Sequence, residues 1–432
     1  MDQENELGYD NYGACCIRKL LYSTADSAAP AGGVQVTMET LPEELLSHIL
    51  SFLSLPEQLK VASVSRQWHQ CVIGCLARYR CFTMDLIPIP AFWYYTNERL
   101  ERVLSHLPGL RRLENVKCQN VGDDLMWFFN IEPAGLLDAD ILCRHCPLLV
   151  EANLRGFKLD VPALERLCLG CPGLEEVTLP AACDEACVEV VLRGLPKLKT
   201  LNIDLKKLTG KFLSLLPANL ERLEMRGVFK LLEEELERAP SYTTLEELDI
   251  TGLKNASCPA LVKLLSVCPQ LMMLDAYGSG ITDAFLEQLP VKIPGLRVLH
   301  ISGCEGLSEA GLLNLARLKE LRWLDLFDTN TTDAVLRGLL SATRLSFLAV
   351  GSHCDRPIQS TEDVLCDLVL ALPSLREVRL SRGIWINDVI SFLNGRLPHH
   401  RNVTLSLPTS ATSKLYDEPE EGDPLRLEIY PD

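Results

Sequence analysis

One spacing of leucines governs most of this chain. Leucines that begin the pattern L-x-x-L-x-L recur from residue 174 to residue 345, which is 171 residues in seven steps, or about 24.4 residues per step. They stand at Leu174, Leu198, Leu220, Leu245, Leu271, Leu296, Leu321 and Leu345. Weaker copies begin at Leu110, Leu149 and Leu375, and a terminal one is NVTLSL at 402–407. A fixed period of this length predicts a repeat architecture, in which one structural unit recurs along the chain.

Each copy has the pattern of one strand followed by one helix. L-x-x-L-x-L places apolar side chains on one face of a short strand, with polar ones between them. Pairs such as Thr282-Asp283 and Thr332-Asp333 then predict a helix N-cap with an acid near the positive end of the helix dipole. An apolar stripe follows at helical spacing. A unit of about 25 residues cannot bury its own apolar face, so neighbouring units must stack.

Two C-x-x-C pairs, Cys143/Cys146 and Cys168/Cys171, have almost the spacing of a four-cysteine zinc site. Both cysteines of the first pair recur 25 residues later, so the pairs occupy the same position of consecutive repeats. Stacked repeats place such side chains in parallel rows, whereas a metal site needs four thiols to converge. Reduced thiols suit tight buried corners. We therefore predict structural cysteines and no metal site, with a metal or redox role as the alternatives.

The pattern resembles the leucine-rich repeat family in its long, cysteine-containing variety, C-P-x-L-x-x-L-x-L-x-x-C. The resemblance covers roughly residues 100–407 and implies an α/β solenoid shaped like a horseshoe, with parallel strands on the concave face and helices on the convex face. We expect a repeat domain at 86–407 with about 11–12 repeats, then an acidic C-terminal tail at 408–432. An insertion at 119–135 is predicted to form either a second contact site or a plug on the end repeat.

A helical module precedes the repeats, in METLPEELLSHILSFLSLPEQLKVASVSRQWHQCV at 38–72. Thr40 and Glu43 predict a capping box, and Leu55-Pro56 ends the first apolar helix. A second helix follows, and a third includes Trp68. The composition predicts three short helices of which part of the apolar surface serves a partner, because about 45 residues are marginal as an isolated domain.

This module resembles an F-box. The signature L-P-x-E-h-h-x-x-h-h-x-x-L, followed by V-x-[RK]-x-W, is matched from Leu41 to Leu53 and from Val64 to Trp68. We expect the F-box at 38–85 and a flexible tail at 1–37.

The resemblance implies a role in ubiquitin transfer. F-box proteins with leucine-rich repeats generally serve as substrate receptors of Skp–cullin–F-box ubiquitin ligases. The F-box binds a Skp-family adaptor, which connects it to the cullin and RING subunits, and the repeats bind the substrate protein. Carried over position by position, the adaptor contacts would be Leu41, Pro42, Leu45, Ile49, Leu50, Leu53, Val64 and Trp68. The alternative is a scaffold that is held by the adaptor and leads to no degradation.

The rest of the sequence indicates no catalytic machinery. It contains no phosphate-binding loop, nucleophile elbow or H-E-x-x-H motif. Its net charge of −16 disfavours a nucleic-acid surface, and no run of about 18 apolar residues predicts a membrane span. The acidic start, MDQENELGYD, does not resemble a signal peptide. We expect a non-enzyme without cofactor, in the cytoplasm and/or nucleus, where thiols stay reduced.

The substrate is expected on the concave face. Alternate strand positions point away from the core, and from 273 to 347 they carry several aromatic residues, which dominate binding hot spots. Two aspartates among them could meet a basic group. The predicted substrate contacts are Met273, Asp275, Tyr277, His300, Trp323, Asp325, Phe327, Phe347 and Arg379. The alternative is that the C-terminal tail, with apolar residues from Leu425 to Tyr430, folds back over this surface.

Overall fold

A computed structural model of the chain describes residues 41–83, 97–114, 137–155, 157–180, 183–203, 208–227, 232–352, 361–381, 386–393, 396–398, 401–408 and 424–430. The chain divides into two compact units. The first contains residues 1–158 and 166–174, and the second contains residues 159–165 and 175–432. The tail predicted at 1–37 and the insertion predicted at 119–135 lie outside the described residues.

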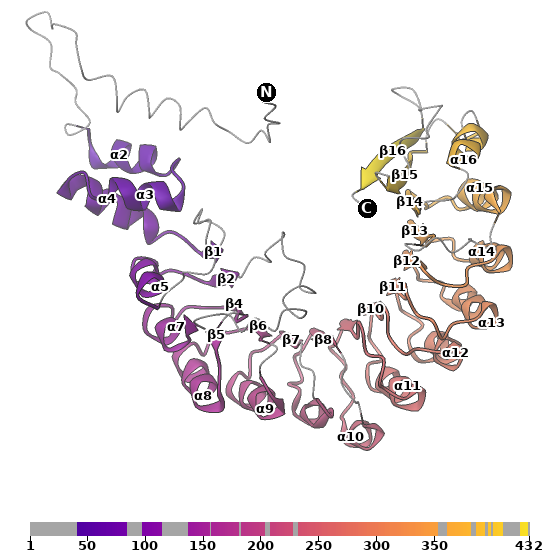
Figure 1. Ribbon diagram of the computed structural model, residues 1–432, viewed down its shortest axis with the longest axis horizontal. Coiled ribbons are helices and arrows are strands. Elements are labelled where there is room, and N and C mark those ends of the chain that lie inside the picture. The colour runs from indigo at the N-terminus through magenta and orange to yellow at the C-terminus, as the bar shows by residue number, and fades with distance from the viewer. Residues whose placement is uncertain are drawn as a thin grey trace, which may run out of the picture. The chain divides into compact units, whose positions relative to one another are not determined.

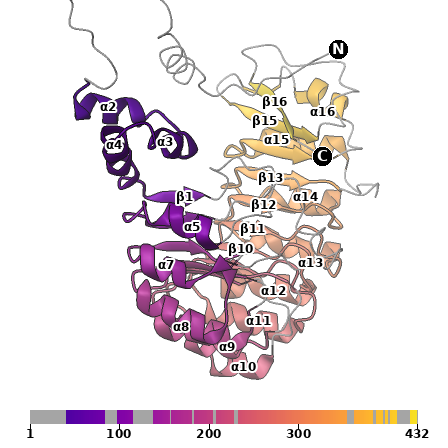
Figure 2. The same ribbon diagram turned by 60° about the vertical axis from the view of Figure 1, so that its left-hand side comes forward.

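The described part of the first unit begins with three short helices, seen together in Figure 2: α2 (Glu43–Leu50), α3 (Leu55–Val61) and α4 (Arg66–Leu76). Their apolar side chains form one small core, in which Leu46 and Val72 are fully buried and Trp68 is 2% exposed. The hydroxyl of Ser65 accepts a hydrogen bond from the Trp68 N–H at 3.2 Å and so caps α4. The capping box predicted at Thr40 lies outside the described residues.

The rest of the first unit contains strands and helices of the repeat type. Strands β1 (Cys81–Thr83), β2 (Arg112–Glu114) and β4 (Glu151–Asn153) belong to one parallel sheet, while β3 (Leu137–Asp138) pairs with β5 (Phe157–Lys158). The helices of this part are α5 (Asn97–Leu104) and α7 (Asp140–His145), and α8 (Val161–Gly170) lies at the boundary between the two units.

The second unit repeats strand, turn and helix, with the strands in one layer and the helices in the other (Figure 1). Its strands follow one another in sequence order and are parallel. They are β6 (Glu176–Leu179), β7 (Thr200–Ile203), β8 (Arg222–Met225), β9 (Glu247–Asp249), β10 (Met273–Asp275), β11 (Val298–His300), β12 (Trp323–Asp325), β13 (Phe347–Val350), β14 (Glu377–Leu380), β15 (Val403–Pro408) and β16 (Leu425–Tyr430). The helical layer contains α9 (Glu185–Gly194), η4 (Lys211–Leu215), α10 (Glu233–Arg238), α11 (Cys258–Val267), α12 (Asp283–Lys292), α13 (Glu309–Leu312), η5 (Leu313–Arg317), α14 (Asp333–Leu339), α15 (Glu362–Ala371) and α16 (Ile386–Leu393).

The leucine period sets the register of this sheet. Leu274, Leu299, Leu324 and Leu348 are consecutive register partners, and each is fully buried. The residues on either side of each leucine point away from the helices, because side chains alternate along a strand. The predicted α/β repeat fold with parallel strands is confirmed. We call the side-chain surface of β7 to β14 that points away from the helices the strand face.

The chain leaves several of these strands through a left-handed residue. Gly252, Gly278 and Gly303 have φ values of 72°, 57° and 68°. The next repeat has Asp328 there, at φ 55°, and its Oδ1 accepts a hydrogen bond from the Ser352 hydroxyl at 2.6 Å. A left-handed backbone favours glycine, and aspartate tolerates it better than most other residues. The turn is therefore built into the repeat.

The acids after the helix caps connect neighbouring repeats. The carboxylate of Asp283 accepts a hydrogen bond from the Ser308 N–H at 2.8 Å, and that of Asp333 accepts one from the Thr361 N–H at 2.7 Å. The sequence predicted only that these acids lie near a helix N-terminus, which they do. Each one also satisfies a backbone donor at the start of the next repeat.

Part of the predicted acidic tail is a strand. Residues 425–430 form β16, which pairs in parallel with β15, and Leu425 is 2% exposed. The Tyr430 hydroxyl donates to the Leu380 carbonyl at 2.8 Å. Strand pairing satisfies the backbone groups that β15 would otherwise leave open at the sheet edge. Over these residues the chain thus extends the sheet beside β15.

The cysteine pairs lie in the corners that the repeat predicts. Cys146, Cys168 and Cys171 are buried, and the Cys171 thiol donates to the Cys146 carbonyl at 3.5 Å. Burial raises the pKa of Cys146 to about 12 and is the main cause that raises the pKa of Cys171 to about 12. Within the described ranges, no group of three or more His, Cys, Asp or Glu side chains is arranged to hold a metal ion. In the same ranges, no helix is long and apolar enough to cross a membrane.

Alkylation should separate the buried thiols from the accessible ones. In native protein at pH 8 we expect Cys146 and Cys171 to react with iodoacetamide about 100-fold more slowly than the half-buried Cys258, because thiolate and access are both required. Timed labelling followed by peptide mass spectrometry measures the rates. In denaturant all three should react alike, and fast native labelling of Cys146 would contradict the packing described above.

Candidate recognition surfaces

The three-helix module of the first unit exposes large apolar side chains. Leu45 on α2, Phe52 just after it and Val64 before α4 are 52%, 68% and 59% exposed. The ring of Phe52 lies edge-on to His48, with 5.0 Å between ring centroids. The interior of the module is already filled by other residues, so these three are not needed for its core. Exposed apolar side chains on so small a module indicate a surface that binds another protein.

The structure divides the predicted adaptor contacts into two sets. Leu50, Leu53 and Trp68 are 0%, 8% and 2% exposed, so they build the interior of the module and the prediction that they contact a partner is corrected. The others reach the surface: Leu41 and Ile49 are half-buried, and Pro42, Leu45 and Val64 are exposed. Phe52 was missed, because it occupies a variable position of the signature.

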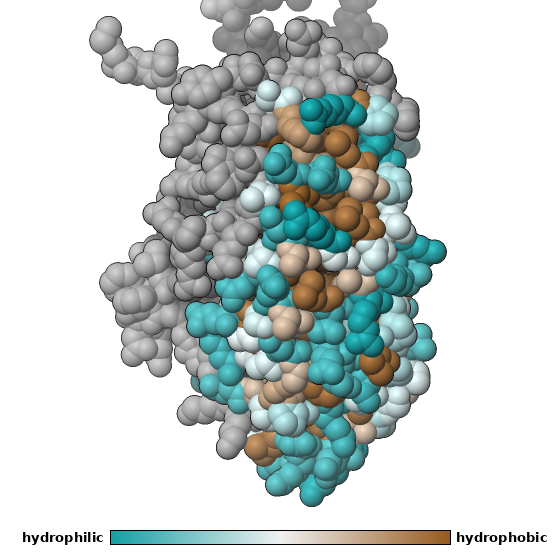
Figure 3. Space-filling model, turned by 90° about the vertical axis from the view of Figure 1, so that its right-hand side faces the viewer, coloured by the Kyte–Doolittle hydropathy of each residue, from teal (hydrophilic) through white to brown (hydrophobic). Residues whose placement is uncertain are grey.

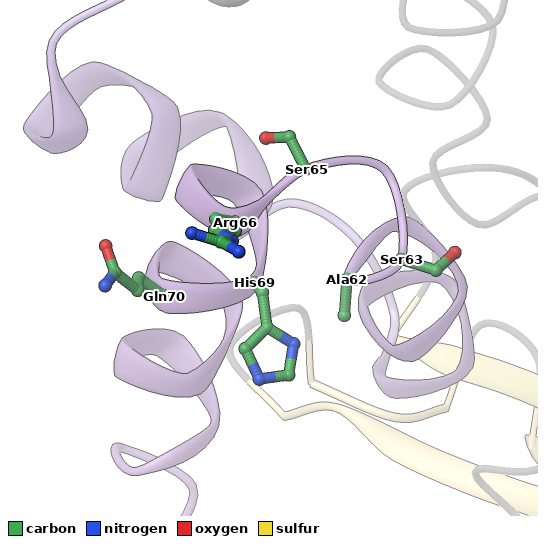
Figure 4. Close-up of a pocket in the computed structure, with 6 residues that line it drawn as sticks. All are labelled: Ala62, Ser63, Ser65, Arg66, His69 and Gln70. Atoms are coloured by element: carbon green, nitrogen blue, oxygen red, sulfur yellow. The ribbon is translucent and has the colours of Figure 1, made fainter.

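A pocket of about 410 Å³ lies on the same module, between the end of α3 and the start of α4. Figure 4 shows His69 on α4 and Ala62 after α3 pointing into the space between the two helices, while Gln70 points away from Ala62 on the far side of α4. The lining contains no carboxylate. The pocket adjoins the chain segment of Val64, and Arg66, His69 and the two serines place hydrogen-bonding groups beside the exposed apolar side chains.

On the second unit, one row of the strand face is apolar. Met273, Val298, Trp323 and Phe347 are register partners on β10 to β13. The Trp323 and Phe347 rings stack 3.6 Å apart at an interplanar angle of 9°. Side chains directly opposite on adjacent strands are close enough for such contacts. The predicted order of residues along this face is therefore the observed one.

Two aromatic residues of the predicted substrate site are not accessible. Phe327 and Phe347 are each 3% exposed and pack in one cluster with Ala349 and Trp323. A Cβ at Gly351 would lie 2.7 Å from the Phe327 ring, so the glycine makes room for it. The prediction that both rings face solvent is wrong, because Trp323 stacks on Phe347 and Phe327 packs in the same cluster.

Arg379 on β14, the register partner of Ala349, reaches over the Phe347 ring with its side chain. Its guanidinium lies 5.4 Å from the centroid of the Phe347 ring and 5.2 Å from that of Tyr430 on β16. Both separations fit cation–π contacts. It also lies 3.7 Å from a carboxylate oxygen of Glu377. Arg379 is therefore engaged within the chain, between the aromatic cluster and the C-terminal strand.

The second row of the strand face is acidic. His300 lies between Asp275 and Asp325, its register partners on β10 and β12. Its Nδ1 is 3.3 Å from Asp275 Oδ2, while Asp325 Oδ1 accepts from the Phe327 N–H at 3.0 Å. Burial lowers the pKa of His300, but the hydrogen bond and charge of Asp275, with the charges of Asp325 and Asp249, raise it above its ordinary value overall. Burial likewise raises the pKa of Asp275, and the His300 hydrogen bond and other donors lower it overall.

Stability should depend on pH through His300. The pKa of His300 in the folded chain is raised above the ordinary 6.5. Protonated His300 therefore contributes fully to the free energy of unfolding below about pH 6.5, and this contribution is lost as the pH rises through the folded-state pKa. We expect the free energy of unfolding of the wild type, relative to that of His300→Gln, to fall over this window. Urea denaturation at a series of pH values measures it, and a difference that is constant with pH would contradict the pairing with Asp275.

The strand face on β8 and β9 is occupied by ion pairs within the chain. Arg222 pairs with Glu247 at 2.5 Å, and Arg226 pairs with Asp249 at 2.6 Å and with Glu224 at 3.3 Å. The accessible part of the predicted site is therefore β10 to β12. It presents Tyr277 at 49% exposure and half-buried Met273, Asp275, His300, Trp323 and Asp325.

The helical side of the second unit has a mixed surface. Figure 3 views it from the side where Figure 1 shows α13 to α16, and apolar residues lie among polar ones. Val291, Leu313 and Leu340 are 59%, 39% and 40% exposed. Single exposed apolar residues are ordinary on protein surfaces. The strand face and the three-helix module are thus the stronger candidates.

Comparison with known proteins agrees with the helical module and with the repeat fold. The F-box-like family matches residues 38–83. The chain is similar to Leucine-rich repeat-containing protein 42 of Xenopus tropicalis, 32% identical over 123 residues, or 26% of this chain and 30% of that protein. It is also similar to a Transport inhibitor response 1-like protein of Oryza sativa subsp. japonica, 29% identical over 163 residues, or 34% of this chain and 26% of that protein. The alignments span less than a third of either relative. The chain thus combines an F-box-like domain with a leucine-rich-repeat fold.

Proposed function

We propose that this chain is the substrate-recognition subunit of a Skp–cullin–F-box ubiquitin ligase. Its F-box-like domain binds a Skp-family adaptor, and its strand face binds the protein to be ubiquitinated. The observation that carries the proposal is the exposure of Leu45, Phe52 and Val64 on a domain whose own core is complete. The F-box-like match and the two relatives support it.

In this proposal the chain supplies position and no bond-making group. The adaptor connects the F-box-like domain to the cullin and RING subunits, and the conjugating enzyme carries the ubiquitin. A bound substrate is held near that enzyme, which raises the effective concentration of its lysines. The alternative is a scaffold that the adaptor holds without degradation of any partner.

Purification of the tagged full chain from cells tests the proposal. We expect a Skp-family adaptor, a neddylated cullin and a RING subunit to co-purify with it. We also expect at least one bound protein to accumulate when the chain is removed from the cells. The same protein should accumulate to the same level when the proteasome is inhibited instead. An adaptor complex without neddylated cullin and without any accumulating partner would favour the scaffold and overturn the receptor proposal.

A further inference from the structure

We propose that the strand face between β10 and β12 binds a lysine or arginine side chain of the partner, in the space above Val298. This rests on the proposed receptor function and names the chemistry that its substrate presents.

The free part of the strand face is short. On β8 and β9 the charged side chains pair with one another, as Arg226 does with Asp249 at 2.6 Å. On β13 and β14 the Phe347 ring is covered by Trp323 and by the guanidinium of Arg379. A partner group can therefore approach the sheet most directly over β10 to β12.

The indole of Trp323 has one covered ring face and one facing a small residue. Phe347 on β13 stacks against it at 3.6 Å with nearly parallel planes. The opposite ring face must turn toward β11, about 4.8 Å away. Val298 is the register partner there, and its side chain is short. The His300 ring, two residues along β11, is tilted by 45° with its centroid 6.1 Å away. A cation placed above Val298 would lie against the ring face of the indole that turns toward β11, which is the geometry of a cation–π contact.

Carboxylates flank the same site. Asp275 and Asp325 lie one strand to either side of His300, about 7 Å along the sheet from the row of Val298. Asp325 has no ion pair within the described part of the chain, and it is half-buried, where a charge is screened less than in water. The Nε2 of His300 is also buried there without a hydrogen-bond partner among the described residues. His300 already pairs with Asp275, so a basic side chain would supply the counter-charge that Asp325 lacks among the described residues.

The apolar residues around the site suit the stem of such a side chain. Met273 is half-buried beside Val298, and Tyr277 is 49% exposed beyond Asp275. Lysine and arginine bury their methylene groups on apolar surface while the charged end finds polar partners. An acidic partner would instead meet two carboxylates, and an aliphatic one would leave Asp325 without a counter-charge.

A displayed library of random nonapeptides, selected on the full chain in complex with its adaptor, tests the inference. We expect selected peptides to share one lysine or arginine. Replacement of that arginine by citrulline, its uncharged analogue, should weaken binding about tenfold or more in fluorescence polarisation. Selection of peptides without a basic residue, no selection at all, or equal affinity of the citrulline peptide would overturn the inference.

Variants of the chain locate the site. Val298→Arg places a cation above β11 and should abolish binding of the selected peptide, whereas Val298→Leu should change it less than about threefold. Asp325→Asn should weaken binding about tenfold or more, with a smaller salt dependence. Unchanged binding in Val298→Arg would place the peptide elsewhere. Co-purification of adaptor and neddylated cullin is measured separately, so the receptor function can hold while the inference fails.

Discussion

The double variant Leu45→Asp, Phe52→Asp is expected to lose more than about 100-fold of its affinity for a Skp-family adaptor while the chain stays folded. Both side chains are more than half exposed, so a charge there costs the folded chain little. In an interface the same carboxylates would be buried without partners, which costs several kcal/mol. A loss of about 2.7 kcal/mol already corresponds to 100-fold.

Two further variants make this result specific. Arg78→Asp adds a carboxylate at an exposed position just after α4 and should leave adaptor affinity within about threefold of wild type. Trp68→Ala removes a side chain that is 2% exposed and should cost about 3–5 kcal/mol of stability, so loss of binding there would report unfolding. Calorimetric titration with purified adaptor and thermal melts measure both quantities. Wild-type affinity in the double variant would refute the predicted interface.

Phe285→Ala is expected to destabilise the repeat array by about 3–5 kcal/mol. Phe285 is fully buried on α12, where it is among the largest enclosed side chains of the described residues. Its removal leaves a cavity that the flanking repeats cannot close. Each repeat is stabilised mainly by its neighbours, so the damage should spread to the adjacent helices α11 and α13.

The matched variant is Val291→Ala on the same helix. Val291 is 59% exposed, so we expect a change below about 0.5 kcal/mol. Urea denaturation measures the loss of stability, and native-state hydrogen exchange measures how far the added opening spreads. Equal stability of the two variants, or exchange confined to α12, would contradict the nearest-neighbour packing.

The repeat register could be read from the sequence because it rests on two simple periods. Leucines at alternate strand positions must share one buried face, and a step of about 25 residues aligns each strand with the next. Leu274, Leu299 and Leu324 are indeed paired and buried. The same reasoning placed Met273, Val298 and Trp323 in one row of the opposite face.

The accessibility of individual side chains could not be read in the same way. Phe327 and Phe347 occupy strand positions that point away from the helices, yet they are buried by Trp323 and by one another. In the F-box-like domain the signature combines residues of the core, such as Trp68, with residues of the surface, such as Val64. A pattern of apolar positions does not separate core residues from surface residues, because residues of both kinds are apolar.

By itself, the sequence determined that this chain has a helical module followed by a stacked array of parallel strands and helices, since local periodicity decides which face of each element is buried. The tertiary structure alone decided which groups remain free. The Arg379 contacts and the ion pairs of β8 and β9 occupy much of the strand face, and pairing of β16 with β15 covers the edge of the sheet. These contacts depend on distances between residues 20 or more positions apart, which hydrophobic periodicity does not encode.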